Sequence, residues 1–381
     1  MSDTLQLFRP RYEVDECIRE IRSVLESGWT GQGPKCSAFE NAWCEYIGCR
    51  NAHFVSSATA ALHIALHLTG KPEGTKVATT PLTFVSTNAV ILYERMIPVF
   101  CECGRDMSLQ YESVRYAVLK KGAKVVMWVH YGGNVSDDFY RLMDDLKNDK
   151  KFADVRVIED CAHAAGASYM DGTMVGSRTD TISCYSFHSV KNLPIMDGGF
   201  ICVPDDEEDR RARRLSWLGI DKSTYVRTEG SGSELYKWSY NVPELGWKYN
   251  GNDIAAAIGL VQLKYLDRDN AYRKWISQQY ESQIRDQFFM HHYSGSSHHL
   301  VVIFVEDRDK AIASLKAAGI APGVHYLPNY RFPVFSGFDH SSCLAVENMS
   351  QHILSLPNHL ELDRKQIKRV CSALSDCGAI K

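Results

Sequence analysis

Short apolar segments alternate with stretches of helical spacing through the first half of the chain. Apolar runs of about four to eight residues are typical of strands that are buried on both faces of a sheet. Their alternation with helices predicts a largely parallel sheet covered on both faces, which is the α/β class. The expected strands cover residues 76–79, 124–129, 155–159, 181–187 and 200–203. The expected helices cover residues 13–27, 59–69, 109–120, 137–147 and 205–218.

A second, smaller domain is expected after residue 250. Residues 253–275 have the spacing of one long helix, and the aromatic-rich residues 225–249 before them show no periodicity. A strand and two helices are predicted beyond them, at 299–305, 310–318 and 363–375. At roughly 150 residues per domain, the 381 residues suggest two or three domains, and two are expected because α/β units often run larger. We expect a large α/β domain over residues 1–250 and a small C-terminal α+β domain over residues 251–381.

Charge, hydropathy and cysteine content limit the partners and the cell compartment that are expected for this chain. The net charge of −3 gives no indication of a nucleic-acid or anionic-membrane partner. The sequence contains no run of the roughly 20 apolar residues that a membrane span needs, and its polar N-terminus lacks a signal peptide's apolar stretch. Twelve scattered cysteines without a C-x-x-C pair indicate reduced thiols. We expect a soluble, cytoplasmic protein.

A carboxylate and a lysine follow two of the expected strands. Asp160 comes after strand 155–159, and Lys191 comes after strand 181–187. Ligands of open α/β sheets bind at the carboxyl ends of the strands. A pyridoxal-phosphate (PLP) enzyme needs both groups there: the lysine forms an imine and moves protons, and the carboxylate keeps the pyridine nitrogen protonated. Taken alone, most such pairs are surface charges.

Small and hydroxyl-bearing residues open the helix expected at 59–69. Residues 56–61 read Ser-Ser-Ala-Thr-Ala-Ala and follow an apolar run. Free backbone N–H groups and the helix dipole make such a helix N-terminus a phosphate site. An ordinary N-cap at Ser57 is the alternative.

The histidines and glycines provide no further motif. His63 and His67 have the spacing of a zinc pair, but the glutamate of a metalloprotease helix does not follow His63. We therefore expect both to be ordinary helix residues, and we expect no metal site. His291, His292, His298 and His299 flank Ser/Gly-rich sequence and are expected to be exposed. The glycines spell neither a dinucleotide fingerprint nor a P-loop.

An ordered series of short motifs runs through nearly the whole chain. They include EDCAHA at 159–164 and SFHSVKNL at 186–193. The others lie at 28–34, 57–63, 81–85, 129–132, 197–199, 244–250 and 252–257. In this order they resemble the DegT/DnrJ/EryC1/StrS family of sugar aminotransferases, which are fold-type I PLP enzymes. The resemblance implies a large domain with a mostly parallel sheet, a small C-terminal α+β domain, and a homodimer with shared active sites.

The resemblance also implies the reaction. PLP takes an amino group, expected to come from L-glutamate, and its pyridoxamine form (PMP) passes that group to the ketone of a nucleotide-linked deoxy-sugar. Members of the family that eliminate water carry histidine at the lysine position, so Lys191 argues against a sugar dehydratase. Lys191, Asp160 and the phosphate loop together argue against a non-catalytic regulator. A keto-ulosonic acid stays open as the acceptor.

Residue by residue, the resemblance implies the following cofactor contacts. Lys191 matches the lysine that holds PLP as a Schiff base, and Asp160 matches the partner of the pyridinium nitrogen. His163 stands where the family usually has glutamine, beside the ring oxygen. The remaining matches are Ala58, Thr59 and Ser186 around the phosphate and Phe84 stacked on the ring.

Other matches concern the substrate and the partner subunit. Thr30, His325 and Tyr326 match the family's substrate-side positions. Many members have Asn-x-Arg where this chain has Lys248 and Asn250. Lys248 is expected to reach the cofactor phosphate of the partner subunit. An exposed lysine on an irregular loop is the alternative.

Overall fold

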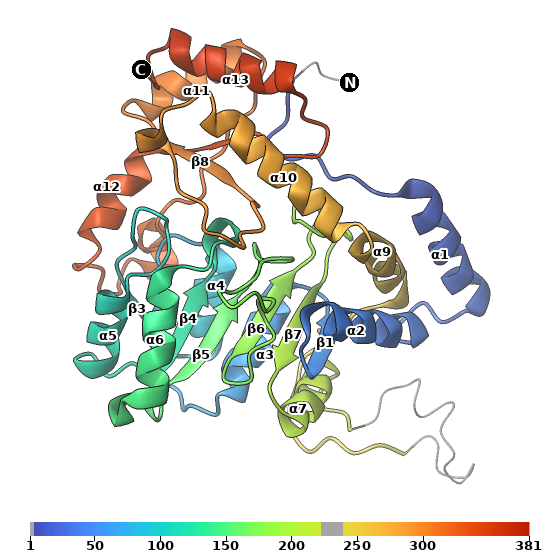
Figure 1. Ribbon diagram of the computed structural model, residues 1–381. Coiled ribbons are helices and arrows are strands. Elements are labelled where there is room, and N and C mark those ends of the chain that lie inside the picture. Colours follow the sequence, from blue (N-terminus) through green and yellow to red (C-terminus); the bar gives the residue numbers. More distant parts are fainter. Residues whose placement is uncertain (1–3, 222–238, 381) are drawn as a thin grey trace.

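The computed structural model describes residues 4–221 and 239–380, and within them the chain forms two layered regions (Figure 1). The larger region is a seven-stranded sheet with helices on both faces. Strand β7 runs antiparallel to both of its neighbours, and the other neighbouring pairs are parallel. The sheet order is β1 (Asn51–Val55), β7 (Gly199–Val203), β6 (Ile182–Ser186), β5 (Arg156–Asp160), β4 (Val125–Val129), β2 (Lys76–Thr79) and β3 (Ile97–Phe100).

The central strands are apolar throughout because both faces of the sheet are buried. In β4, Val125 and Met127 pack into the core under α3 (Ala58–Leu68), while Val126 and Trp128 pack into the core on the opposite face. Successive side chains of a strand point to opposite faces, so a strand covered on both sides needs apolar residues at every position. The other helices of this region are α1 (Val14–Ser27), α2 (Pro34–Ile47), α4 (Val85–Tyr93), α5 (Tyr111–Leu119), α6 (Asp137–Asn148) and α7 (Asp206–Ser216).

The second region has its own hydrophobic core and a two-stranded antiparallel sheet. Leu5, from the start of the chain, packs into this core, and its backbone pairs with Gly319 and Ala321. The N-terminal segment therefore lies against the C-terminal part of the chain. The elements here are α10 (Leu266–Glu281), β8 (Val301–Phe304), α11 (Arg308–Ala317), α12 (Leu344–His352), β9 (Ile353–Leu356) and α13 (Arg364–Asp376). The division at residue 250 remains a prediction.

The predicted elements are largely confirmed, with one clear error. All five expected strands of the large sheet are present, with ends within one residue of the prediction. The single helix expected at 253–275 is instead two helices, α9 (Asp253–Leu263) and α10. Between them, the side chains of Lys264 and Tyr265 both bond to Glu16 of α1. Most of the irregular segment expected at 225–249 lies outside the described residues.

Two further sequence-based expectations concern the state of the cysteines and the presence of a membrane-spanning helix. All twelve cysteines are free, and nine of them are buried. Within residues 4–221 and 239–380, no helix combines the length and the hydropathy that crossing a bilayer requires.

Candidate active site

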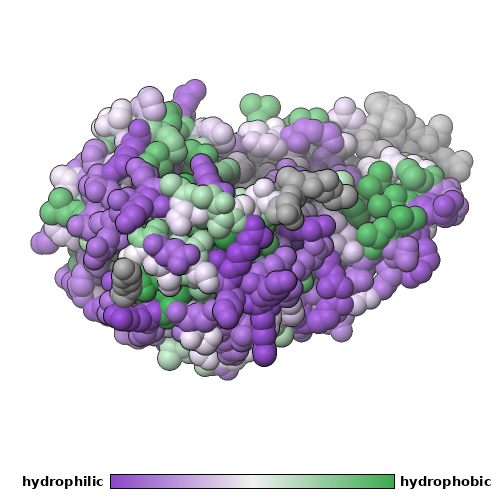
Figure 2. Space-filling view, turned by 90° about the horizontal axis from the view of Figure 1, so that it is seen from above, coloured by the Kyte–Doolittle hydropathy of each residue, from purple (hydrophilic) through white to green (hydrophobic). Residues whose placement is uncertain are grey.

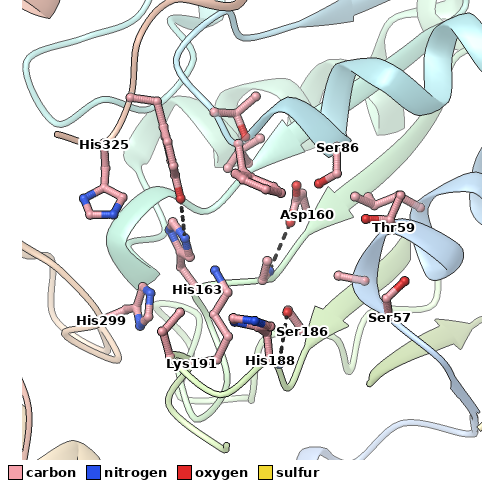
Figure 3. A pocket seen from close by; sticks show the side chains of 18 of the residues that line it. Ser57, Thr59, Ser86, Asp160, His163, Ser186, His188, Lys191, His299 and His325 are labelled. Atoms are coloured by element: carbon pink, nitrogen blue, oxygen red, sulfur yellow. Dashed lines mark hydrogen bonds between the residues drawn. The ribbon is translucent and has the colours of Figure 1, made fainter. Parts of the chain in front are cut away.

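A cavity of about 450 Å³ opens where β5 and β6 end and α3 begins (Figure 3). Lys191, Asp160 and the first residues of α3 all line it. This is the position at which ligands of open α/β sheets bind, and the volume is that of a small-molecule pocket. The sequence-based expectation that the carboxylate and the lysine meet at one edge of the sheet is therefore confirmed.

Asp160 is buried at the edge of this cavity, and Lys191 is half-buried in it. Asp160 is the last residue of β5, and its carboxylate accepts hydrogen bonds from the Thr87 hydroxyl at 2.7 Å and the Ala162 N–H at 3.1 Å. Burial raises the pKa of Asp160, and these two bonds oppose that effect. Burial lowers the pKa of Lys191 to about 8, although nearby Asp160 favours the charged lysine. The lysine can therefore exchange a proton near neutral pH.

The N-terminus of α3 forms the opposite end of the cavity. Ser57 is its N-cap and accepts a hydrogen bond from Ala60 N–H at 3.1 Å, as the alternative interpretation proposed. The first N–H groups of a helix have no partner within it, so those of Ala58 and Thr59 can bind an anion. A Cβ atom at Gly199 would lie only 2.8 Å from the Ala58 nitrogen, so this glycine allows β7 to pass close beside the helix end.

His163 stands beside Lys191 with its proton position fixed (Figure 3). The Gly132 backbone N–H donates to Nδ1 of His163 at 3.2 Å, so Nδ1 must be unprotonated. Burial holds the pKa of His163 well below its usual value, so the ring is neutral. Its Nε2–H then donates to the Tyr326 hydroxyl at 3.1 Å. His163 thus holds its one N–H at Nε2, and in this structure the Tyr326 hydroxyl accepts it.

The donor set fits pyridoxal phosphate part by part. The N-terminus of α3 and the Ser186 hydroxyl suit a phosphate, Asp160 suits a protonated ring nitrogen, and Lys191 suits an aldehyde. Phe84, which caps α4 and is 58% exposed, offers a flat aromatic face at the cavity. The residues present in this chain therefore provide a partner for each functional group of that cofactor.

Comparison with known proteins agrees with this geometry. The profile of the DegT/DnrJ/EryC1/StrS aminotransferase family matches residues 11–375. The chain belongs to this family. It is 32% identical over 377 residues to the spore coat polysaccharide biosynthesis protein SpsC of Bacillus subtilis (strain 168), covering 95% of this chain and 94% of that protein. The expected family, fold class and PLP-dependent aminotransferase type are confirmed.

Two solved structures show how closely the fold of this aminotransferase follows those of its relatives. The putative sugar aminotransferase Spr1654 from Streptococcus pneumoniae, in its PMP form, gives a TM-score of 0.88 at 26% identity, over 97% of this chain and 98% of that one. AtS13 from Actinomadura melliaura gives 0.88 at 26% identity, over 98% of this chain and 99% of that one. Spr1654 has also been solved in a PLP form.

Two predicted site residues of this aminotransferase do not reach the cavity of their own chain. Thr30 lies in the exposed loop after α1 and is not among the residues that line the cavity. Lys248 also lies outside it. Its Nζ donates to Asn250 Oδ1 at 2.7 Å and sits 3.5 Å from the centroid of the Trp217 ring. The predicted substrate contact of Thr30 and the predicted cofactor contact of Lys248 are therefore not made within one chain of this structure.

The substrate-side loop does reach the cavity. His325 and Tyr326 both line it, and His325 Nδ1 lies 2.8 Å from the Ser355 hydroxyl. Burial lowers the pKa of His325 to about 4, so this imidazole is neutral at neutral pH. Together with His163, the loop forms a polar wall without a formal charge.

Four histidines were expected to be exposed, and this was wrong for three of them: His292 is half-buried, and His298 and His299 are buried. His299 is only 3% exposed and lines the cavity, and His298 is also buried. The His299 N–H bonds to Gly132 O, which ties this segment to the loop after β4. The apolar run that begins at residue 300 was the available signal, because it leads directly into β8. His63 and His67 are helix residues, as expected, and both contact Glu94.

Replacing Lys191 by methionine is expected to stabilise the cofactor-free protein near pH 7 by up to roughly 3 kcal/mol. Burial lowers the pKa of Lys191 from 10.5 to about 8, so the folded state holds the ammonium less favourably than the unfolded state does. That cost falls as the pH rises from about 8 to 10.5 and disappears above this range. Urea unfolding of wild type and Lys191→Met, at pH 7 and near pH 10.5, measures this difference in the free energy of unfolding. An equal gain at both pH values would contradict the assigned shift.

Proposed function

We propose that this aminotransferase moves an amino group from L-glutamate to the keto group of a nucleotide-linked deoxy-sugar. The observation that carries the proposal is the single cavity in which Lys191, Asp160 and the α3 N-terminus face one another. The match to SpsC, a polysaccharide biosynthesis protein, supports a sugar as the acceptor. The polar, uncharged wall formed by His163, His325 and Tyr326 suits hydroxyl groups. We place the reaction in the cytoplasm, where the free cysteines stay reduced.

The protein's own residues supply the acid–base chemistry. When bound, PLP supplies an aldehyde that carries the amino group and a pyridine ring that withdraws electrons from the reacting carbon. Lys191 Nζ accepts a proton from the substrate carbon and returns one, which its pKa of about 8 permits near neutral pH. Asp160 holds the proton at the pyridine nitrogen. The His163 Nε2–H, which bonds to the Tyr326 hydroxyl in this structure, would donate to the ring oxygen of the bound cofactor instead.

Transfer of labelled nitrogen tests the proposed donor and acceptor together. The PLP-loaded protein is incubated with ¹⁵N-L-glutamate and a panel of nucleotide-linked keto-sugars, with a keto-ulosonic acid as the competing class. We expect ¹⁵N in an amino-sugar product, detected by mass spectrometry. Label found only in the product of the ulosonic acid would overturn the proposed acceptor. Label transferred to no keto compound would overturn the proposed function.

We propose further that the working form is a homodimer whose active sites are shared. Val14, Ile18 and Leu25 of α1 are 59%, 51% and 58% exposed and carry apolar side chains into solvent. Figure 2 shows hydrophobic residues gathered toward the end of the molecule that carries α1 in Figure 1. Exposed apolar patches mark protein–protein contacts. Thr30 and Lys248, which lie outside their own cavity, are the residues proposed to enter the partner's site.

Mixing two inactive variants is expected to restore activity if Lys248 serves the partner's cofactor. A phosphate of about two negative charges calls for a cation as well as N–H donors, so Lys248→Ala alone should be strongly impaired. After subunit exchange between Lys191→Ala and Lys248→Ala proteins, each heterodimer should contain one intact site. Activity is measured before and after exchange, and the Lys191→Ala protein exchanged with itself is the control. An unimpaired Lys248→Ala protein, or no recovery after exchange, would refute the cross-subunit role.

A further inference from the structure

Three histidines form the wall of the cavity that lies away from the α3 N-terminus (Figure 3). They are His163, His299 and His325, and burial lowers the pKa of each, most deeply for His163 and His299. A neutral imidazole has one N–H donor and one lone-pair acceptor. Which nitrogen faces the cavity therefore decides whether each ring can receive a hydrogen-bond donor or an acceptor from a ligand.

The neighbour of Lys191 fixes the proton of His299. The Asn192 side-chain amide donates to the Ser297 backbone carbonyl at 2.9 Å and to Asn270 Oδ1 at 2.7 Å. A backbone carbonyl only accepts, so the orientation of the Asn192 amide is determined and both of its N–H groups are used. Its oxygen lies 2.6 Å from His299 Nδ1. His299 must therefore carry its proton on Nδ1 and a lone pair on Nε2.

Packing holds the His299 ring in this orientation. The ring lies 4.4 Å from the ring of His163, centroid to centroid, and Phe8 stacks on it at 5.7 Å with an interplanar angle of 12°. His163 has an N–H at its Nε2, whereas His299 has a lone pair at its own Nε2. The two adjacent rings thus offer opposite hydrogen-bonding groups. His163 already bonds to Tyr326, while within residues 4–221 and 239–380 the His299 ring is hydrogen-bonded at Nδ1 and not at Nε2.

We propose that His299 selects the acceptor by receiving, at Nε2, a hydrogen bond from a hydroxyl group next to the reacting ketone. This inference rests on the proposed function and names a feature of its substrate. The hydroxyl must lie next to the ketone because His299 and Lys191 face the same part of the cavity, and Lys191 must reach the reacting carbon. A site built to bond a hydroxyl discriminates against the analogue that lacks it, because a buried acceptor is then left unpaired.

Two variants of His299 separate the two nitrogens. In His299→Asn, the side-chain amide can still donate to Asn192 from the position of Nδ1, but nothing replaces Nε2. In His299→Gln, the amide reaches the position of Nε2 and can accept there, but the bond to Asn192 is lost. The pair therefore distinguishes loss of the cavity-facing acceptor from loss of the bond that positions the ring.

The experiment measures kcat/KM for a keto-sugar and for its analogue that lacks the hydroxyl next to the ketone. We expect wild type to favour the hydroxylated acceptor by about tenfold or more. His299→Asn should lose most of this preference, to within about threefold, through a lower kcat/KM for the hydroxylated acceptor alone. His299→Gln should keep more of the preference than His299→Asn. The glutamate half-reaction and thermal unfolding are measured in parallel.

Three other results would overturn either the inference about His299 or the proposed function. If His299→Asn slows both acceptors and the glutamate half-reaction by the same factor, or melts earlier without changing the preference, His299 is structural and the inference is overturned. If wild type shows no preference between the two acceptors, the inference is also overturned. If no keto-sugar is aminated at all, the proposed function itself fails, and that result is recognised before any variant is compared.

Discussion

Replacing Lys191 by alanine is expected to lower amino transfer by a factor of roughly 1,000 or more, because the proton acceptor at the reacting carbon is lost. Lys191 lines the cavity with its pKa lowered to about 8, and within residues 4–221 and 239–380 no other lysine lines that cavity. Single-turnover transfer from L-glutamate, followed by the change in cofactor absorbance, measures the loss. Binding of the pyridoxamine form of the cofactor should survive, since it needs no covalent bond to the protein.

Lys191→Arg is the matched control for that experiment. Arginine keeps the positive charge and much of the length of the side chain, but it does not release its proton at accessible pH. It should therefore be as inactive as the alanine variant. Full activity in Lys191→Ala would contradict the mechanism, and activity restored by arginine would show that charge, rather than proton transfer, is what the position supplies.

Asp160→Asn is expected to bind PLP and yet keep less than about a tenth of the wild-type turnover, a cost above ~1.4 kcal/mol in the barrier. Asparagine fills the same space at the end of β5 but cannot stabilise a protonated ring nitrogen, so the reacting carbon loses its electron sink. Turnover and bound cofactor are measured on the same preparation.

Asp197→Asn provides the comparison, since Asp197 is a second carboxylate at this cavity but is exposed. The same chemical change there should cost much less than it does at Asp160. More than a tenth of the wild-type turnover in Asp160→Asn, or an equal loss at Asp197, would show that the assignment of Asp160 is wrong.

The parts of the fold that sequence predicts well are those that one local pattern determines. The five expected strands are buried on both faces, so their apolar runs end where the strands end. Polar residues at the carboxyl ends of such strands, or in the loops that follow, meet at one edge of the sheet, and Asp160 and Lys191 do so. The N-cap at Ser57 likewise follows from its local sequence.

Other features depend on contacts between distant segments. Strand β3 contains Pro98 and lies at the edge of the sheet, where a missing N–H is tolerated, so its sequence does not look like a strand. The break between α9 and α10 contains neither glycine nor proline and coincides with bonds to Glu16 of α1. His299 reaches the cavity only because β8 packs beside the large sheet's loops. The role proposed for Lys248 would require a second subunit, which one sequence does not reveal.

The most direct test of the account is to find where the cofactor is attached. The purified protein loaded with PLP is expected to be yellow, and borohydride reduction should fix the cofactor covalently to the protein. Digestion and mass spectrometry then identify the modified peptide. We expect the cofactor on the peptide that contains Lys191, and no such attachment in Lys191→Ala. Attachment to a different lysine, or modification that persists in Lys191→Ala, would contradict it.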